Sequence, residues 1–291
     1  MKRFLLMAAT LVAAPAMASI GVDGTAEGAY GAAVSVQTLQ TNFGDANMGA
    51  VDYANGSELD AAYAVIKGGN LYLTLAGNLE SNFNKLEIFI DSHAGGQNQL
   101  RGDNPNVDFN GLNRMAGLTF DAAFSPDHWL SVTGGGGPYQ MYANYSELLS
   151  GGGGNGYYLG QTGAASGGVL GGGFNPNGIL ATINNSNAGG VTGGTGPSSG
   201  AGVTTGVEFC IPLAALGDPT GPICISAFVN GGGHDFVSNQ VLGSLPNGTG
   251  NLGEPSTVNF NNHEGDQFFC VVPEPASLVL AAVGLLALRR R

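Results

Sequence analysis

Short alternations of hydrophobic and polar residues run through the chain. Leucine or isoleucine occupies every second position in residues 71–75 and again in residues 86–90. Because the side chains of a strand point alternately to its two faces, this period of two residues predicts two strands. Glycine and asparagine residues in the connection, residues 77–84, predict that the two strands pair as a hairpin.

The same β-like pattern recurs along most of the chain. Further predicted strands are residues 63–66, 117–124, 128–133, 140–145, 207–211, 223–230, 236–241 and 267–272. Helical periodicity is nearly absent, and only residues 145–150 and 212–216 have the composition of a single helical turn. Many short strands at this spacing predict an all-β fold, an antiparallel β-sandwich that forms one domain over residues 19–271.

The stretch from residue 151 to residue 205 interrupts this pattern. It is rich in glycine and holds few large apolar side chains, so we expect a long loop or insertion. The alternative is that its glycines let short strands turn tightly. Residues 156–160 and 178–183 are the candidates for such strands.

The N-terminus has the pattern of an export signal. Lys2 and Arg3 precede an apolar run over residues 4–14, and Ala16 and Ala18 follow with the spacing of a signal-peptidase site. We therefore predict a signal peptide over residues 1–18, which the export machinery recognises and removes. An uncleaved N-terminal transmembrane helix is the alternative, although the apolar run is short for one.

The C-terminus combines a rigid segment, an apolar run and a basic end. Pro273 and Pro275 disfavour helix, so a helix is expected only over residues 276–288, which carry no charge. Three arginines, Arg289, Arg290 and Arg291, follow and would stay on the cytoplasmic side of a membrane. Such a helix rises only about 20 Å, short of a hydrocarbon core of roughly 30 Å, which suits a temporary anchor.

Val272, Pro273, Glu274 and Pro275, with the apolar run and the terminal arginines, resemble the PEP-CTERM sorting signal of exported bacterial proteins. The resemblance implies recognition by an exosortase and cleavage near the Pro-Glu-Pro segment. It also implies transient anchoring in the inner membrane through the predicted helix, then release or transfer to the cell surface or extracellular matrix. An ordinary C-terminal transmembrane anchor is the alternative.

Removing both terminal segments makes the remaining chain strongly acidic. Lys67, Lys85, Arg101 and Arg114 are the strong bases left between residues 19 and 272, against 20 carboxylates, a net charge of −16. A surface of this sign repels nucleic acid and anionic lipid, so neither is an expected partner of the body. Cations are compatible with it.

The chain has three cysteines, Cys210, Cys224 and Cys270. In an oxidising compartment one pair can form a disulfide and one thiol is left over. We predict the Cys210–Cys224 pair, because each lies in a predicted strand and a Gly/Pro-rich turn joins the two strands. The alternatives are the other two pairings, or three buried free cysteines; the cysteine spacing does not suggest zinc.

Candidate metal ligands lie around residues 103–111, an Asp/Asn-rich stretch. Asp103 and Asp108, with Asp91 at the end of a predicted strand, offer oxygen ligands suited to calcium. Calcium is the one cofactor that the sequence suggests, and a solvated loop that binds no ion is the alternative. The four histidines, His93, His128, His234 and His263, are scattered and select no catalytic arrangement.

Three segments of the body, DGTAEGAYG at 23–31, NLYLTLAGNLESNFNKLEIFIDS at 70–92 and GHDFVSNQVLGSLPNGTGNLG at 233–253, resemble segments of bacterial surface proteins. The first two are also similar to jelly-roll sandwiches of the DOMON-like and family-nine carbohydrate-binding classes. That likeness implies either glycan binding between aromatic side chains or haem binding through Met and His. The aromatic candidates in this chain are Trp129, Tyr139, Tyr142, Tyr145, Tyr157 and Tyr158.

The function expected from the sequence is that of an exported cell-surface or extracellular-matrix protein without catalytic residues. A carbohydrate-binding module, with extracellular polysaccharide as its partner, is the first alternative. A secreted hydrolase is the second, although no carboxylate pair or serine can be assigned to catalysis from sequence.

Overall fold

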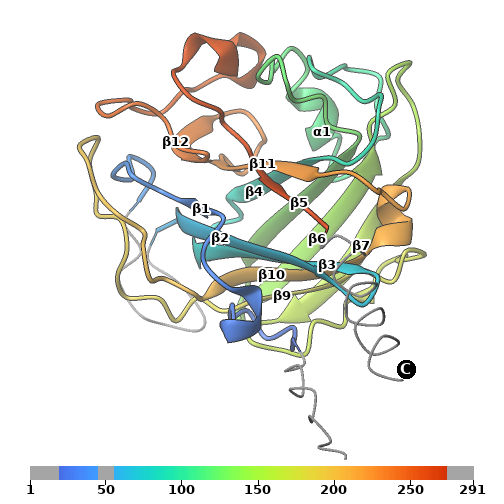
Figure 1. Ribbon diagram of the computed structural model, residues 1–291, viewed down its shortest axis with the longest axis horizontal. Coiled ribbons are helices and arrows are strands. Elements are labelled where there is room, and N and C mark those ends of the chain that lie inside the picture. Colours follow the sequence, from blue (N-terminus) through green and yellow to red (C-terminus); the bar gives the residue numbers. More distant parts are fainter. Residues whose placement is uncertain (1–19, 45–55, 274–291) are drawn as a thin grey trace, which may run out of the picture.

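The protein is described from a computed structural model, which covers residues 20–44 and 56–273 (Figure 1). Two antiparallel sheets pack face to face. The smaller sheet has the order β1 (Ser35–Val36), β2 (Glu58–Lys67), β3 (Asn70–Asn78), β10 (Gly206–Pro212) and β9 (Leu180–Ile183). The larger sheet has the order β12 (Val237–Leu242), β11 (Ile223–Asn230), β4 (Lys85–Asp91), β5 (His128–Gly135), β6 (Gln140–Glu147), β7 (Gly156–Gly163) and β8 (Gly171–Gly172), and β13 (Phe269–Val271) pairs with β11.

Helix is confined to short turns in the described residues. These are η1 (Gly28–Tyr30), α1 (Gly111–Arg114), η2 (Leu213–Leu216), η3 (Pro255–Thr257) and η4 (Phe260–Asn262). Within the described ranges, no helix has both the length and the apolar character needed to cross a membrane. The nearly all-β, antiparallel, two-sheet architecture predicted from the residue pattern is confirmed.

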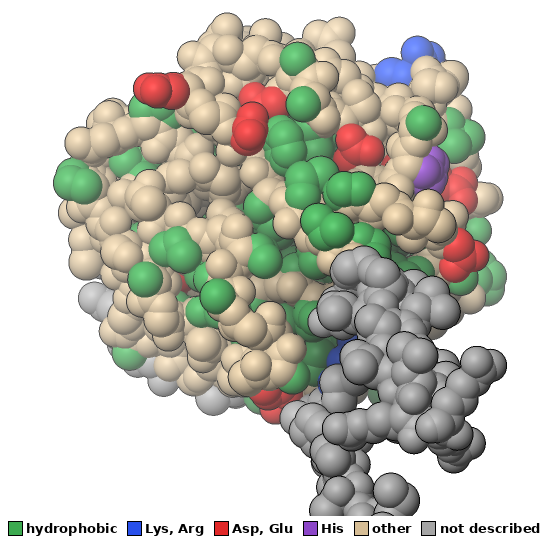
Figure 2. Space-filling model, viewed as in Figure 1, with side chains coloured by type: hydrophobic (Ala, Val, Ile, Leu, Met, Phe, Trp, Pro, Cys, Tyr) green, Lys and Arg blue, Asp and Glu red, His purple; other side chains and the backbone are tan. Residues whose placement is uncertain are grey.

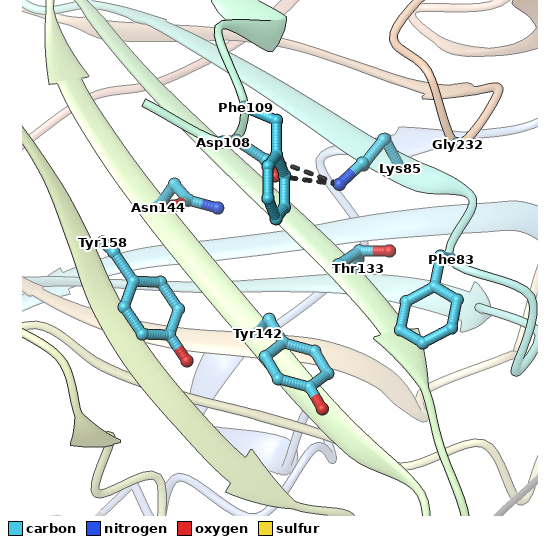
Figure 3. Close-up of a pocket in the computed structure, with 9 residues that line it drawn as sticks. All are labelled: Phe83, Lys85, Asp108, Phe109, Thr133, Tyr142, Asn144, Tyr158 and Gly232. Atoms are coloured by element: carbon cyan, nitrogen blue, oxygen red, sulfur yellow. Dashed lines mark hydrogen bonds and ion pairs between the residues drawn. The ribbon is translucent and has the colours of Figure 1, made fainter. Parts of the chain in front are cut away.

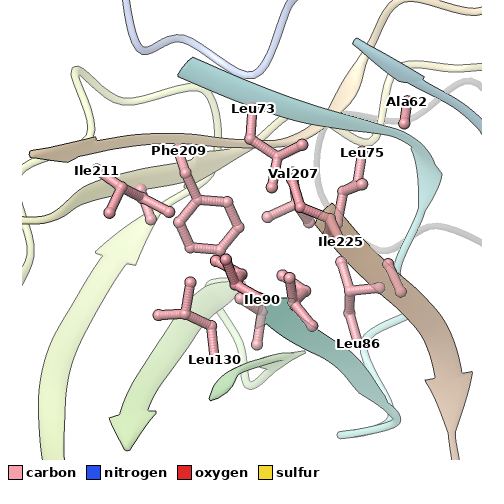
Figure 4. Close-up of a cluster of buried hydrophobic side chains, with 14 of the residues drawn as sticks. Ala62, Leu73, Leu75, Leu86, Ile90, Leu130, Val207, Phe209, Ile211 and Ile225 are labelled. Atoms are coloured by element: carbon pink, nitrogen blue, oxygen red, sulfur yellow. The ribbon is translucent and has the colours of Figure 1, made fainter. Parts of the chain in front are cut away.

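The main core fills the space between the two sheets (Figure 4). Leu73 and Phe209 point into it from neighbouring strands of the smaller sheet, and Ile90 and Ile225 meet them from the larger sheet. All four side chains are fully buried. At about 1.5–3 kcal/mol for each large apolar side chain removed from water, this layer is the main stabilising contact between the sheets.

The predicted hairpin of residues 71–75 and 86–90 is wrong. β3 pairs with β2 and β10 in the smaller sheet, whereas β4 pairs with β11 and β5 in the larger one. Both strands alternate in the same way because both bury one face in the shared core, from opposite sides. The connection between them therefore crosses from sheet to sheet instead of turning within one.

A second apolar cluster covers part of the outer face of the larger sheet. Phe89 and Trp129 project outward from β4 and β5, and Phe120 and Phe260 cover them from the loops. Residues 117–124, predicted as a strand, form part of this cover; Thr119 makes only isolated bridges there. The other predicted strands contain strand residues in the structure. The cover leaves the far part of β5, β6 and β7 open.

The glycine-rich residues 151–205 are not a structureless insertion. They supply β7 and β8 to the larger sheet and β9 to the edge of the smaller one, as the alternative of short, tightly turning strands predicted. Gly160 shows why glycine is needed here. Its φ is +128°, and a Cβ would lie 2.6 Å from the carbonyl oxygen of Gly171 on the neighbouring strand.

The predicted Cys210–Cys224 disulfide is also wrong. Cys210 lies in β10 of the smaller sheet and is a buried free thiol, whereas Cys224 lies in β11 of the larger sheet. Cys224 is bonded instead to Cys270, its direct partner in the β11–β13 ladder, with the two Cα atoms 4.0 Å apart. Burial raises the pKa of the Cys210 thiol, which keeps it in the unreactive protonated form.

Candidate functional site

A cleft of about 560 Å³ opens on the outer face of the larger sheet, beyond the second apolar cluster (Figure 3). Its floor is made by residues of four neighbouring strands. Its walls come from the loops that precede β4 and α1 and from the turn after β11. The lining residues are Phe83, Lys85, Asp108, Phe109, Thr133, Tyr142, Asn144, Tyr158 and Gly232.

The strand register places the floor residues side by side. Lys85 on β4 lies opposite Thr133 on β5, which in turn lies opposite Tyr142 on β6. Asn144 on β6 lies opposite Tyr158 on β7, just beyond a register shift in this ladder. Side chains of a strand alternate between its two faces. Lys85 and Thr133 each lie four residues from an outward-facing residue of the same strand, Phe89 or Trp129, so they also face outward.

Aromatic rings surround this polar floor. Figure 3 shows Tyr142 and Tyr158 next to each other on the sheet, with Phe83 on one side and Phe109 above them. Phe109 is fully exposed, and Phe83 and Tyr158 are 48% and 38% exposed. Exposed rings gathered around one cavity are unusual on a soluble surface, because each leaves apolar area in contact with water. The arrangement suits a ligand that covers them.

The loop that carries Phe109 has an unfavourable backbone. Asp108, Phe109 and Asn110 have φ values of 46°, 55° and 67°, three successive residues in the left-handed region. Each such residue costs on the order of 1 kcal/mol, and strain of this kind persists only where the surroundings enforce it. The enforcing contacts are those of the Asp108 side chain.

Asp108 is the centre of a buried polar network under the cleft. Its carboxylate accepts two hydrogen bonds of 3.0 Å from Lys85 Nζ and one of 2.6 Å from Ser131 Oγ. His234 Nε2 lies 3.1 Å from the same carboxylate in an ion pair. Burial raises the pKa of Asp108, but His234 and Lys85 outweigh this effect and hold the pKa well below its usual value.

His234 joins Asp108 to a second carboxylate. Its Nδ1 lies 2.7 Å from Glu87 Oε1, and Glu87 also accepts hydrogen bonds from Trp129 Nε1 at 3.0 Å and Asn230 Nδ2 at 3.1 Å. Burial lowers the pKa of His234, but the two carboxylates, Glu87 first, more than offset it and raise the pKa to about 9. The imidazole is therefore charged at neutral pH. The positive charges of His234 and Lys85 balance the carboxylates of Glu87 and Asp108.

The structure does not bring the three predicted calcium ligands together. Asp108 is paired with Lys85 at the first residue of β4, whereas Asp91 is the last residue of that strand, roughly 20 Å away. Asp103 is exposed and forms an ion pair with Arg101. The calcium assignment to Asp91, Asp103 and Asp108 is therefore wrong, because each carboxylate lies in a different place and has its own partner.

The aromatic candidates divide between core and cleft. Tyr142 and Tyr158 line the cleft, whereas Tyr139, Tyr145 and Trp129 are buried. Phe83 and Phe109 were not predicted from the sequence, and His234 was one of four scattered histidines. The one sequence signal for Phe109 is that it is a hydrophobic residue inside an Asp/Asn-rich stretch. No sequence signal indicates that His234 pairs with Glu87, which lies 147 residues away.

Residues 271–291 match the PEP-CTERM protein-sorting motif. The motif implies an exported protein that an exosortase processes. Comparisons with curated proteins and with solved structures gave no match.

The sorting motif begins at the last residue of β13, Val271. Within it, Val272 is exposed, two residues after Cys270. Glu274, Pro275, the predicted helix at 276–288 and the three terminal arginines lie outside the described residues, as do the predicted signal peptide and its cleavage residues Ala16 and Ala18.

Proposed function

We propose that the body of this exported protein is a non-catalytic carbohydrate-binding module, which acts at the cell surface or in the extracellular matrix. The cleft on the larger sheet is the binding site in this proposal. The observation that carries it is the set of aromatic rings around a polar floor: Phe83, Phe109 and Tyr158, which are exposed, and Tyr142, which is half-buried.

The cleft offers partners for both the apolar face and the polar edges of a sugar ring. Pyranose rings present C–H groups that stack on aromatic faces, and their hydroxyl groups need hydrogen-bond partners at the edges. Tyr142 and Tyr158 supply aromatic faces on adjacent strands, and Asn144 and Thr133 lie beside them with amide and hydroxyl groups. Sites of this kind combine apolar contact area with a few fixed polar groups.

The charge of the protein favours a neutral polysaccharide. Figure 2 shows a face in which uncharged polar groups and backbone predominate and acidic side chains outnumber basic ones. At the cleft itself Lys85 is neutralised by Asp108 at 3.0 Å. An anionic polymer would therefore meet repulsion from the body and no unpaired cation in the cleft floor, so uronic-acid-rich and sulfated glycans are poor candidates.

The module is proposed to be non-catalytic because the carboxylates in and beneath the cleft are engaged by other side chains. A glycoside hydrolase needs two carboxyl groups that face the scissile bond from either side. The side chains of Asp108 and Glu87 are both buried and hydrogen-bonded to side chains of the network. They are placed to hold the floor and the Phe109 loop in shape.

The terminal segments complete the proposal. The signal peptide of residues 1–18 would direct export, and the helix of residues 276–288 would hold the chain in the inner membrane until exosortase acts. We also propose that the sandwich is a jelly roll of the DOMON-like type, an architecture that includes glycan-binding modules.

Binding of the full-length protein to neutral soluble polysaccharides, measured by affinity electrophoresis and calorimetry, tests this function. Tyr142→Ala and Tyr158→Ala should each weaken binding about tenfold, the equivalent of 1.4 kcal/mol. Phe174→Ala is the matched control, because Phe174 is an exposed ring that does not line the cleft. Absence of saturable binding, or equal losses in all three variants, would overturn the proposal. Glycan turnover abolished by a carboxylate substitution would indicate the hydrolase instead.

A further inference from the structure

His93, Asp127 and His128 meet at the end of the β4–β5 pair opposite the cleft. His93 follows β4 by two residues, and Asp127 and His128 stand at the start of β5, where Ile90 pairs with His128. His93 and Asp127 are 34 residues apart in sequence, so the sequence pattern alone did not group the three residues. One ligand atom from each side chain lies within 4.8 Å of the others.

The spacing of these atoms fits a bound metal ion. Asp127 Oδ1 lies 3.4 Å from His128 Nε2, and Asp127 Oδ2 lies 3.0 Å from His93 Nδ1. Two ligands at about 2.05 Å from a tetrahedral metal are about 3.3 Å apart. One oxygen of the Asp127 carboxylate therefore lies beside each imidazole nitrogen, and each of these nitrogen–oxygen distances is close to that between two ligands of one ion.

His128 directs an unpartnered nitrogen into the cluster. Its Nδ1 lies 2.8 Å from the hydroxyl oxygen of Tyr145, and that hydroxyl lies 3.2 Å from the carbonyl oxygen of Ala215. When Tyr145 donates its hydroxyl proton to this carbonyl, it accepts from Nδ1–H of His128, and in that tautomer the imidazole lone pair is on Nε2. Nε2 is buried and has no hydrogen-bond partner. It lies 3.4 Å from Asp127 Oδ1, so a cation between the two atoms would give Nε2 a partner.

The supporting contacts are those typical of metal sites. A histidine ligand commonly uses its other ring nitrogen in a hydrogen bond that fixes its orientation, as His128 does with Tyr145. The Asp127 carboxylate is held by the backbone N–H groups of Ser92 at 3.3 Å and His93 at 2.8 Å. His93 is the exposed member, with 45% of its side chain accessible, so the cluster opens toward solvent on that side.

We propose that His93, Asp127 and His128 form a binding site for a divalent transition-metal ion of the Zn²⁺ type. Two imidazole nitrogens and one carboxylate suit zinc and its neighbours, whereas calcium and magnesium prefer all-oxygen sites. Three protein ligands leave one position of a tetrahedral ion for water, on the side of His93. This site is independent of the proposed glycan cleft, at the other end of the same two strands.

Titration of the full-length, chelator-treated protein with Zn²⁺, followed by calorimetry, tests the site, and Co²⁺ absorption reports the ligand geometry. We expect one ion per chain and tetrahedral Co²⁺ bands. His93→Ala, at an exposed position that leaves the core intact, should weaken binding at least tenfold. His263→Ala is the matched control, because His263 is a partly exposed histidine outside the cluster.

Tyr145→Phe tests the positioning role of the tyrosine. Loss of the hydroxyl should lower the zinc affinity by a factor of 10–100 while the stoichiometry stays at one ion. Zinc binding that is undiminished in His93→Ala, or diminished equally in His263→Ala, would overturn the proposal. So would wild-type protein that binds no zinc saturably. Far-ultraviolet circular dichroism of each variant separates loss of the site from loss of the fold.

Discussion

Cys224 and Cys270 lie directly opposite each other in the β11–β13 ladder and are joined by a disulfide. Cys270 is the residue immediately before the matched sorting motif, which begins at residue 271. The covalent link therefore attaches the last strand of the body to the larger sheet just where the motif starts. Processing within the motif would leave this attachment in place.

Removal of this disulfide should destabilise the protein. The bond closes a loop with a sequence separation of 46 residues, and such cross-links contribute about 2–4 kcal/mol. We expect the Cys224→Ser, Cys270→Ser double variant to lose this amount in urea unfolding, and reductant to have the same effect on wild type. Cys210→Ala is the control. Cys210 is a free thiol, so this variant keeps the disulfide, and reductant should destabilise it as much as it destabilises wild type. Equal stability of oxidised and reduced wild type would contradict the assignment.

Replacement of the Pro273, Glu274, Pro275 segment by alanines should abolish processing. Intact mass and cell fractionation of the native protein would then show a full-length, membrane-retained chain, whereas wild type would lose its tail and appear outside the cell. Glu264→Ala, an exposed change in the body, should be processed normally. An intact, membrane-retained chain in both wild type and variant would mean a plain C-terminal anchor.

The buried charge of His234 predicts a pH dependence of stability. Its pKa is raised from an ordinary 6.5 to about 9 in the folded protein. A raised pKa stabilises the fold fully below the unfolded value, and the contribution is lost as the pH rises from about 6.5 through about 9. The loss should be about 3 kcal/mol in urea unfolding over this range.

His234→Gln provides the comparison for this pH series. The variant keeps a side chain of similar length without a titrating group, so it should be less stable than wild type at pH 6 and change less between pH 6.5 and 9. A wild-type stability that rises over that interval, or a variant with the same slope, would show that His234 is not the titrating group.

The strained loop predicts an inverted preference for glycine. At Phe109, with φ at 55°, glycine should be more stable than alanine by about 1 kcal/mol, because only glycine adopts this conformation freely. At the exposed Leu149, which is not in the left-handed region, alanine should be the more stable of the two. Urea unfolding of the four variants measures both differences. Alanine preferred at both positions would mean that the loop is not held in the strained form.

Much of the fold followed from local sequence. The alternation in residues 128–133, 207–211 and 223–230 identified β5, β10 and β11, because a strand with one buried face must repeat every two residues. Residues 272–275 and the basic end identified the sorting motif, which is read along the chain and needs no folded partner. These features depend on neighbours in sequence.

The pairing of strands was decided only in three dimensions. β3 and β4 have the same pattern and lie six residues apart, yet they belong to different sheets. Alternation indicates that one face of a strand is buried, but it does not indicate which strand lies alongside. For the same reason the disulfide partner of Cys224 was predicted wrongly. Pairing depends on how the whole set of apolar faces closes around one core.

The candidate sites were decided in the same way. Residue types alone pointed to Tyr142 and Tyr158, but the cleft also needs Phe83 and Phe109, which loops bring to the sheet. His93 and His128 were scattered histidines until the ends of β4 and β5 placed them around Asp127. The sequence by itself determined the strand-rich, exported character of this protein, because periodicity and sorting signals are local. Tertiary structure decided its candidate sites, because they join side chains that the sequence keeps far apart.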